Sequence, residues 1–453
     1  MWWIKNAQVI DPAQDISGVC DVLIHEGKIL EIRESFSAEE VKEKFENLSN
    51  TSSSLELMNN TSDSVPSWEE IDATGKYLFP GLIDVHTHLR EPGREDKEEI
   101  LSGAEAAVRG GFTTILAMPN TEPVLDQRAL IEFVVNQGKR AGFARIHPIA
   151  AMTKGQHGKE LVEMVELSSA GAVAFSDDGK GVQSAEIMRL ALEYAKLTNL
   201  PVVSHCEDED LARKGAMHRG VISARLGLRG IPGSAESVMV ARDILLAEEG
   251  GGKLHLAHIS AKESVDLIRA AKKRGVDVTA EVNPHHLIFT DEAIAKHQYD
   301  TSYKVNPPLR SEADREALLE GLLDGTIDML ATDHAPHTWE EKTRPFDEAP
   351  FGISGLETSL AAVWKYLVEP GKLSPEVLIK AWSMKPAQRF NLPGGSLKAG
   401  AAADVVLFDP TRSEIVEPGW LVSKGKNTPF LGQELQGFPV MVWVEGCLVY
   451  QRV

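Results

Sequence analysis

The chain has little cysteine and no long apolar run, and each absence excludes a class of protein. Its three cysteines, Cys20, Cys206 and Cys447, lie far apart and form no CxxC pair. They supply neither a disulfide framework nor a structural zinc site, which favours a reducing compartment. No run of about 18 apolar residues occurs, so we expect no transmembrane helix.

The chain also lacks an excess of positive charge. Its 47 Lys and Arg residues stand against 67 Asp and Glu residues, which gives a formal net charge of −20. A nucleic-acid-binding protein needs a basic surface, so we expect no nucleic-acid partner. Binding of small anions stays possible, because a local Arg or His cluster can be positive in an acidic protein. The N-terminus MWWIKNAQVIDP lacks the order of a signal peptide, and we expect a cytoplasmic protein without membrane contact.

Between residues 78 and 335 one pattern repeats: a short apolar run, then a stretch rich in Ala, Leu and Glu. The candidate strands are 77–85, 112–118, 144–150, 172–175, 201–204, 254–258, 277–282 and 327–332. Continuous apolar strands that alternate with helices predict an α/β fold with a parallel sheet buried on both faces. Eight units in about 260 residues fit a (β/α)8 TIM-like barrel. A doubly wound open sheet is the alternative, but no Gly-rich phosphate loop follows the first strand.

The two ends of the chain differ from the middle, because short strands joined by Gly-containing turns dominate both. Neither end has enough strands to bury a core alone. We therefore expect one small β-sandwich built from both termini, with 1–77 and 393–453 as its two parts and 78–392 as the barrel. Residues 35–68 are rich in Ser, Asn, Thr and Glu, and we expect them to form a polar surface insertion.

Histidine and aspartate residues follow several of these strands. They are His86 and His88 after the first strand, Asp178 after the fourth, His205 after the fifth, His258 after the sixth and Asp333 after the eighth. The carboxyl ends of barrel strands form one face, where the active sites of such barrels lie. A single His or Asp at a strand end is more often a cap or a hydrogen-bonded polar residue. Independent causes would rarely place four histidines and two aspartates at the same end, which favours a metal site.

Imidazole and carboxylate ligands without thiolate suit Zn²⁺ in a catalytic site, with Mn²⁺, Co²⁺ or Fe²⁺ as substitutes. The set exceeds the ligands of one tetrahedral ion, so it allows a bridged pair of metals or one metal and a free Asp base. A bound metal lowers the pKa of its water to about 7, and Asp333 is placed to take the proton. Arg90, two residues beyond His88, supplies a fork for a carboxylate.

A set of short motifs adds a family resemblance. In order from residue 80 to 358 they are PGLIDVHTHLREPG, AMPNTEPV, AFSDDGKGVQ, SHCED, AHIS, EVNPHHL, YKVNPPLR, LATDHAPHT and PFGISGLET. Together with the flanking β-segments, they resemble the long bacterial (class I) dihydroorotases of the amidohydrolase superfamily over nearly the whole chain outside 35–68. HxH is general to that superfamily, whereas HLREPG, NPPLR and ATDHAPH together are more specific.

The resemblance implies the reversible cyclisation of N-carbamoyl-L-aspartate to L-dihydroorotate in de novo pyrimidine synthesis, with one or two Zn²⁺ ions. It implies that Asp333 is a metal ligand and the general acid/base, and that the other ligands are His86, His88, Asp178, His205 and His258. Asp178 takes the place of the carboxylated lysine that bridges two metals in many relatives, and only motif position selects it over Asp177. The implied substrate contacts are Arg90, Asn120, Asn306, His337 and the backbone around Phe351 and Gly352.

Two other functions stay open at this point. A hydantoinase or allantoinase would usually carry the bridging lysine, and a non-catalytic scaffold for aspartate transcarbamoylase would typically have lost metal-binding histidines. We expect a homodimer and keep aspartate transcarbamoylase as a candidate partner. We expect residues 337–350 to form a loop that closes over the site and carries His337.

Overall fold

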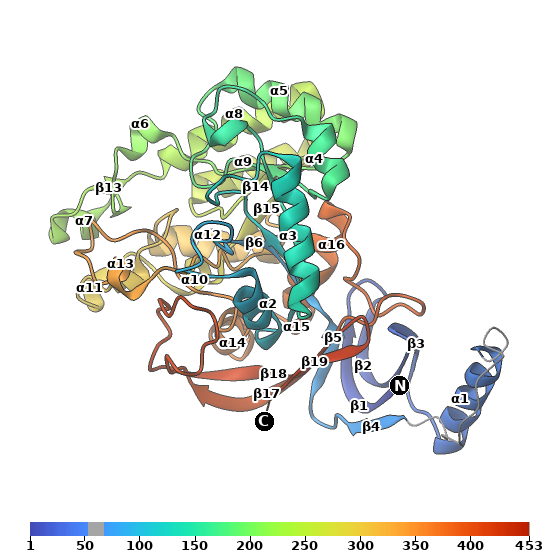
Figure 1. The fold of residues 1–453 in the computed structure, drawn as a ribbon. Coiled ribbons are helices and arrows are strands. Elements are labelled where there is room, and N and C mark those ends of the chain that lie inside the picture. The colour runs from blue at the N-terminus through green and yellow to red at the C-terminus, as the bar shows by residue number, and fades with distance from the viewer. Residues whose placement is uncertain (53–67, 453) are drawn as a thin grey trace.

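The computed structural model describes residues 1–52 and 68–452, which form an α/β part and a β-sheet beside it (Figure 1). The strands of the α/β part are β6 (Leu82–Thr87), β7 (Phe112–Ala117), β8 (Arg145–Pro148), β9 (Ala150–Ala151), β10 (Phe175–Ser176), β11 (Val202–Ser204), β14 (Leu254–Leu256), β15 (Val278–Val282) and β16 (Met329–Leu330). They pair in parallel, in the orders β6-β7-β8 and β9-β10-β11-β14-β15-β16.

The first and last of these strands also meet. Thr87, at the end of β6, forms a parallel bridge with His334, and the His88 N–H donates to the His334 carbonyl at 2.8 Å. One buried cluster contains residues from nearly every strand or strand end: Ile83, Val85, Leu116, Met118, Ile149, Ala174, Val203, Ala257, Met329 and Ala331. A shared interior of this kind is typical of a filled barrel. The (β/α)8 prediction is confirmed.

Helices alternate with the strands. The longer ones are α2 (Ile100–Arg109), α3 (Arg128–Ala141), α4 (Met164–Ala170), α5 (Ala185–Ala195), α8 (Ser234–Gly250), α9 (Lys262–Lys273) and α12 (Glu312–Leu323). In α9 the apolar positions Val265 and Ile268 are buried, and this spacing gives a helix one inward face. Ser311 caps α12 by accepting from the Asp314 N–H, which satisfies a donor that the first turn leaves free.

Shorter elements connect or follow these helices. The α-helices are α6 (Glu209–Ala212), α7 (Val221–Leu226), α10 (Pro284–Ile288), α11 (Glu292–Lys296), α13 (Trp339–Lys342), α14 (Ser359–Val363), α15 (Pro375–Ile379) and α16 (Lys385–Phe390). The 3₁₀ helices are η1 (Lys154–Gln156), η2 (Lys196–Thr198) and η3 (Thr301–Tyr303), and the π-helices are η4 (Trp364–Val368) and η5 (Lys380–Met384). Two short strands, β12 (Met217–His218) and β13 (Gly230–Ile231), lie outside the barrel. No described helix is long and apolar enough to cross a membrane.

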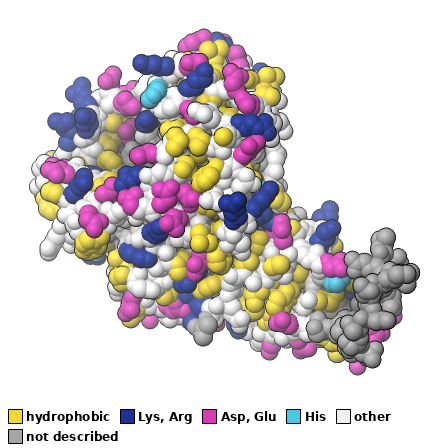
Figure 2. Space-filling model, viewed as in Figure 1, with side chains coloured by type: hydrophobic (Ala, Val, Ile, Leu, Met, Phe, Trp, Pro, Cys, Tyr) yellow, Lys and Arg dark blue, Asp and Glu magenta, His cyan; other side chains and the backbone are white. Residues whose placement is uncertain are grey.

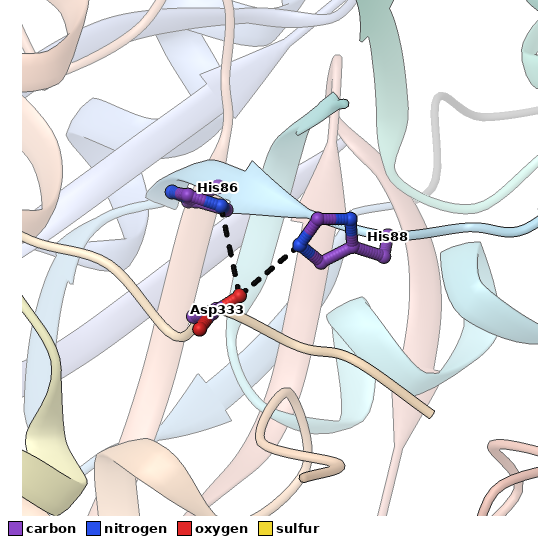
Figure 3. Close-up of side chains that lie close together, drawn as sticks. All are labelled: His86, His88 and Asp333. Carbon is purple, nitrogen blue, oxygen red and sulfur yellow. Dashed lines mark hydrogen bonds and ion pairs between the residues drawn. The ribbon is translucent and has the colours of Figure 1, made fainter. Parts of the chain in front are cut away.

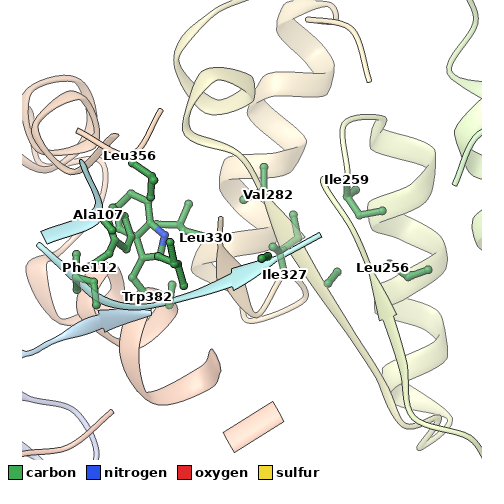
Figure 4. Close-up of a cluster of buried hydrophobic side chains, with 14 of the residues drawn as sticks. Ala107, Phe112, Leu256, Ile259, Val282, Ile327, Leu330, Leu356 and Trp382 are labelled. Atoms are coloured by element: carbon green, nitrogen blue, oxygen red, sulfur yellow. The ribbon is translucent and has the colours of Figure 1, made fainter. Parts of the chain in front are cut away.

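Large side chains fill the space between the barrel strands and the helices around them (Figure 4). Trp382 of η5 is fully buried and meets Phe112 of β7 edge to face, with ring centroids 5.4 Å apart. Leu330 and Val282 belong to the same cluster. An aromatic pair of this geometry adds about 0.5–1.5 kcal/mol beyond the burial of its area.

The terminal segments build one sheet together. Its strands are β1 (Trp2–Asp11), β2 (Ile16–His25), β3 (Lys28–Arg33), β4 (Glu69–Asp72), β5 (Tyr77–Pro80), β17 (Val405–Ile415), β18 (Glu434–Val444) and β19 (Cys447–Gln451). The order is β19-β18-β17-β5-β1-β2-β3, with β4 beside β1, so the antiparallel contact of β17 with β5 joins the two ends of the chain. The predicted β-sandwich is confirmed as one β-domain built from both termini, and its described strands pair as one continuous sheet.

The 35–68 segment is only partly irregular. Helix α1 (Ala38–Ser52) extends at the edge of the terminal sheet, far from the barrel (Figure 1). Its Val41 is buried in a small cluster with Phe36, Trp3 and Leu23, so this apolar position anchors the helix to the sheet. Residues 53–67, which complete the predicted insertion, lie outside the described residues.

The predicted strand over 77–85 is wrong as one element, because it divides at Gly81. Residues 77–80 form β5 of the terminal sheet, and β6 of the barrel begins at Leu82. Both halves are buried, so the apolar pattern gives no sign of the break. A Cβ atom on Gly81 would lie 2.1 Å from Oγ1 of the buried Thr113, so only glycine lets the chain pass between the sheet and the barrel without a shift.

The segment between β17 and β18 crosses the barrel loops. Glu357 accepts hydrogen bonds from the Val422 and Ser423 N–H groups at 2.9 and 3.2 Å. Further along, Asn427 Oδ1 accepts from the His337 N–H at 3.0 Å, and Asn427 Nδ2 donates to the Gly352 carbonyl at 3.0 Å. The C-terminal part of the chain therefore holds two barrel loops in place.

We expect Gly81→Ala to destabilise the fold by about 1–3 kcal/mol, because its methyl group overpacks against Thr113. Gly18→Ala in β2 is the matched control, since nothing lies within 4 Å of its Cβ position. Urea unfolding of both variants measures the free energy of unfolding. Equal losses in the two variants would contradict the steric account of Gly81.

The buried Glu357 carboxyl predicts a pH-dependent stability. Burial raises its pKa from 4.5 to about 7, and the N–H groups of Val422 and Ser423 oppose this only in part. The native state then binds the proton more tightly, so this stability is complete below pH 4.5 and is lost as the pH rises through 7.

We expect wild type to lose about 1–3 kcal/mol of stability relative to Glu357→Gln over that window, because glutamine does not titrate. Urea unfolding of both proteins at a series of pH values measures the difference. Parallel pH curves for the two proteins would show that Glu357 keeps its ordinary pKa.

Candidate functional site

The end of β6 delivers two histidines to the mouth of the barrel. The pairing of β6 with β7 shifts register between Asp84 and Thr87, and such bulges re-aim side chains beside active sites. Nε2 of His86 lies 3.6 Å from Asp333 Oδ1, and Nε2 of His88 lies 3.1 Å from the same oxygen. Figure 3 shows both rings directed at this carboxylate. Asp333 follows β16, so the first and last strands of the barrel, β6 and β16, form one corner of the site.

Asp178, after β10, lies among four histidines. Its Oδ1 is 3.4 Å from His86 Nε2, 3.4 Å from His205 Nδ1 and 3.5 Å from His258 Nε2. Its Oδ2 is 3.5 Å from His88 Nε2. The six residues that the sequence predicts as ligands are therefore all brought together and buried.

The neighbouring Asp177 turns elsewhere. Its Oδ1 accepts from the N–H groups of Met152 and Thr153 at 2.8 and 3.0 Å, and its Oδ2 accepts from the Thr153 hydroxyl. All of these contacts fasten the chain between β9 and η1. Of the two adjacent aspartates, only Asp178 faces the histidines.

The donor set fits a divalent metal ion. His86 Nε2 and Asp178 Oδ1 are buried, yet neither has a hydrogen-bond partner among the described residues. Such orphaned groups cost about 1–3 kcal/mol each unless something satisfies them. Ligand atoms about 2.1 Å from a tetrahedral ion lie about 3.4 Å apart, which matches the spacing here. In two groups of three the ligand atoms all lie within 4.8 Å of one another: His86 with His88 and Asp333, and His86 with Asp178 and His258.

Charges inside the cluster balance each other. Burial lowers the pKa of His86, but the carboxylates of Asp178, Glu281 and Asp333 outweigh it and raise that pKa well above its ordinary value. Burial acts to raise the pKa of Asp333, but His86 and His88 hold it well below the usual range. Asp333 is therefore an ionised carboxylate at neutral pH.

Glu281 of β15 is a site residue that the sequence reasoning missed. Its Oε1 lies 2.6 Å from His86 Nδ1 and accepts a hydrogen bond from the backbone N–H of His258 at 3.2 Å. Its Oε2 lies 2.9 Å from His255 Nε2. A carboxylate on the far nitrogen of a ligand histidine fixes the ring and leaves Nε2 free for metal. The available signal was a charged residue inside the apolar strand VTAEV, since a buried carboxylate needs partners.

A cavity of about 350 Å³ opens beside the cluster, and all the predicted substrate contacts line it. They are Arg90, Asn120, Asn306, His337, Phe351 and Gly352. Asn120 has a second contact that the sequence did not indicate, since its Oδ1 lies 2.9 Å from His88 Nδ1. Asn306 Oδ1 is buried without a hydrogen-bond partner among the described residues, which leaves it available to a ligand.

Arg90 and His337 lie together at one side of this cavity. Arg90 Nη2 is 3.5 Å from His337 Nε2, and Arg90 Nε donates to the Pro336 carbonyl at 3.3 Å. Burial lowers the pKa of Arg90 to about 10, so its guanidinium stays charged at neutral pH. This is the one cation that lines the cavity, among the described residues, apart from the histidines.

The 337–350 loop is packed against the cavity. His337 Nε2 lies 2.8 Å from the Phe351 carbonyl, and its Nδ1 lies 2.9 Å from Glu341 Oε2. The buried Lys342 ammonium donates to the carbonyls of Pro350 and Gly352 at 3.0 and 2.9 Å. These contacts join the first residues of the loop to the residues at and just after its end, beside the cavity.

Known proteins resemble this chain over most of its length. The family model described as dihydro-orotase-like matches residues 75–264. A dihydroorotase of Pelotomaculum thermopropionicum is 54% identical over 84% of this chain and 89% of its own length. A dihydroorotase of Listeria welshimeri is 46% identical over 100% of this chain and 99% of its own.

Solved structures share the fold. The L-hydantoinase (dihydropyrimidinase) of Arthrobacter aurescens superposes with a TM-score of 0.83 at 26% identity, covering 99% of this chain and 96% of that one. A dihydropyrimidinase of Brevibacillus agri gives a TM-score of 0.79 at 24% identity, with 99% and 95% covered. With its sequence relatives at about half identity over most of both chains, this protein belongs to the dihydroorotase family of cyclic amidohydrolases.

Proposed function

We propose that this protein is a zinc-dependent dihydroorotase, which interconverts N-carbamoyl-L-aspartate and L-dihydroorotate in pyrimidine biosynthesis. The observation that carries the proposal is a buried cluster of four histidines and two aspartates beside a cavity with one arginine. Relatives named dihydroorotase, at 46–54% identity, support the same reaction.

His86, His88, Asp178, His205, His258 and Asp333 would hold one or two Zn²⁺ ions. A zinc ion bound there would polarise a carbonyl group and lower the pKa of a water molecule. Only Nε2 of His86 is free to bind, because Nδ1 faces Glu281. The two oxygens of Asp178 face different histidines, which supports its role as a bridge if two ions bind.

Asp333 is proposed as the general acid/base. Its carboxylate is ionised, lies at the cavity wall and can carry a proton between water and the ring nitrogen in either direction. The backbone of Asp333 has a φ of 50°, a left-handed conformation that non-glycine residues rarely adopt. Such strain is concentrated at functional sites, where it fixes a side chain in its working direction.

Substrate binding is proposed for Arg90, Asn120, Asn306, His337 and the backbone of Phe351 and Gly352. N-carbamoyl-L-aspartate carries two carboxylates, and a guanidinium fork binds one of them with two parallel hydrogen bonds. The amides of Asn120 and Asn306 can bind the polar edge of the ring. We also propose that His337 moves with the 337–350 loop when substrate enters.

Two alternatives are less well supported. The solved hydantoinases and dihydropyrimidinases match at 22–26% identity, well below the dihydroorotase relatives. A non-catalytic scaffold would not need four histidines and two aspartates that are all buried in one cluster.

Several further proposals rest mainly on the sequence resemblance. They are a homodimeric assembly and aspartate transcarbamoylase as a partner. A cytoplasmic location is a separate proposal, which rests on the few cysteines and on the lack of a signal-peptide pattern. The division into 1–77, 78–392 and 393–453 is also a proposal, supported by separate apolar clusters in the terminal sheet and inside the barrel.

We expect the zinc-loaded protein to open the ring of L-dihydroorotate and to leave hydantoin and allantoin nearly untouched. Asp333→Asn should lower kcat by about 10²–10⁴-fold, because the proton shuttle is lost. Metal content measured on the same sample separates lost catalysis from lost metal. Absence of dihydroorotate turnover would overturn the function, and full activity of Asp333→Asn would overturn the mechanism.

Asp178→Asn and Asp177→Asn form a matched pair for the metal assignment. Asp178→Asn should weaken metal binding at least tenfold, since Asp178 faces four histidines. Asp177→Asn should keep the metal but lose about 1–3 kcal/mol of stability, because its contacts are to Met152 and Thr153. Metal per chain and urea unfolding provide the two readouts. The reverse outcome would exchange the two roles.

A further inference from the structure

A second hollow, lined by polar side chains, lies outside the cavity of the proposed active site. It is formed by the long connection, here called the excursion, between β11 and α8. Residues 211–235 of this excursion include Arg213, Lys214, Arg219, Arg225 and Arg229. The same stretch contains no Asp or Glu, although the whole chain carries a net charge of −20. In Figure 2, Lys and Arg side chains gather on the surface over α6 and β13. This is a local basic surface on an acidic protein.

The basic side chains surround a real depression. Arg213, Arg219 and Arg229 line a hollow of about 810 Å³, together with the hydroxyl-bearing Ser223 and Ser234. Among the described residues no Asp or Glu lines it, and its lining shares no residue with that of the 350 Å³ cavity of the proposed active site. Its volume lies within the range of about 300–1,000 Å³ that small-molecule sites occupy.

The arginine charges in this hollow are not neutralised by carboxylates of the described chain. Arg213 Nε donates to the Asp210 carbonyl at 3.1 Å, and Arg229 Nη1 donates to the Arg213 carbonyl at 2.9 Å. These backbone contacts orient two guanidinium groups without cancelling their charge. Arg219 has no side-chain hydrogen bond or ion pair among the described residues, whereas arginines such as Arg189 and Arg274 pair with glutamates.

Backbone pairing and close packing support the segment that carries these arginines. Strands β12 and β13 pair in parallel, and a Cβ atom on Gly230 would lie 2.3 Å from the Arg219 backbone. Behind them, the buried Arg310 lies 3.4 Å from His218 Nδ1 and donates to the Ile231 carbonyl at 3.5 Å. The same side chain pairs with Glu236 of α8. The excursion is therefore fastened to the barrel, and the arginines stand on a fixed support.

We propose that this hollow binds a small molecule with a chain of phosphate groups. Guanidinium forks match phosphate oxygens in geometry and charge, and three of them around one hollow favour several phosphates over a single carboxylate. Leu211, Leu228 and Pro232 line the same hollow and can contact an apolar moiety. A nucleoside polyphosphate and inorganic polyphosphate share the phosphate chemistry that the arginines recognise.

Calorimetric titration of the zinc-loaded full chain tests the site, with inorganic tripolyphosphate, ATP and UTP as separate probes. We expect binding that weakens with salt and that falls at least tenfold in Arg213→Gln/Arg219→Gln/Arg229→Gln. The control Arg128→Gln/Arg140→Gln/Arg274→Gln removes the same charge from exposed positions elsewhere, and should bind within about twofold of wild type.

The urea unfolding midpoints of both triple variants should match wild type, which shows that they fold and keeps this test independent of the proposed reaction. Equal affinity for tripolyphosphate and the nucleotides would assign recognition to the phosphates alone. Tighter nucleotide binding would add the apolar side of the hollow to the site. No binding, or equal weakening in both triple variants, would overturn the proposal.

Discussion

The closure of the strand ring is the constraint on which the rest of this structure depends. Asp333 and His88 are 245 positions apart in the chain, yet their side chains approach to 3.1 Å. Backbone contacts at the seam make this possible, since the His88 N–H donates to the His334 carbonyl. Beside them, the Thr332 N–H and hydroxyl both donate to Asp84 on β6. A shift of either strand along this seam would separate the histidines from their aspartate.

Buried charge is the second constraint, and it explains why the site extends behind the proposed metal ligands. Four histidines and two aspartates in a small volume would be costly unless each had a partner. Glu281 takes the far nitrogen of His86, while Asn120 takes that of His88. These partners set the rings so that their remaining nitrogens converge. The cavity beside them is then left with Arg90 as its main positive group.

The terminal domain contributes more than a separate small sheet. The segment between β17 and β18 contacts the barrel at two places. The Val422 N–H donates to Glu357 of the barrel, and Asn427 contacts both His337 and the Gly352 carbonyl. Because β5 from the front of the chain pairs with β17 from the back, this segment starts from a fixed position. Loops that carry proposed substrate contacts thus depend on residues near the C-terminus. The terminal sheet supports the geometry of the site as well as its own core.

Much of this protein could be predicted from its sequence, because parallel strands impose simple rules. Apolar runs that alternate with helical stretches indicate the barrel, and the carboxyl ends of such strands share one face. This rule alone predicts that His86, Asp178 and Asp333 lie close together. The choice of Asp178 over Asp177 rested on motif position, whereas the structure gives a physical reason, since Asp177 is occupied by Met152 and Thr153.

Only the tertiary structure decided which strand belongs to which sheet and which side chains support the proposed metal ligands. Both halves of 77–85 are apolar, and the Pro80-Gly81 dipeptide signals a turn without showing that the chain changes sheets there, a crossing that depends on the distant Thr113. Glu281 and Asn427 act through partners far away in the chain, and local sequence patterns carry no information about such partners. Strand ends and residue chemistry are local properties, which can be read from the sequence. Contacts between segments that are remote in the chain form only in the folded structure.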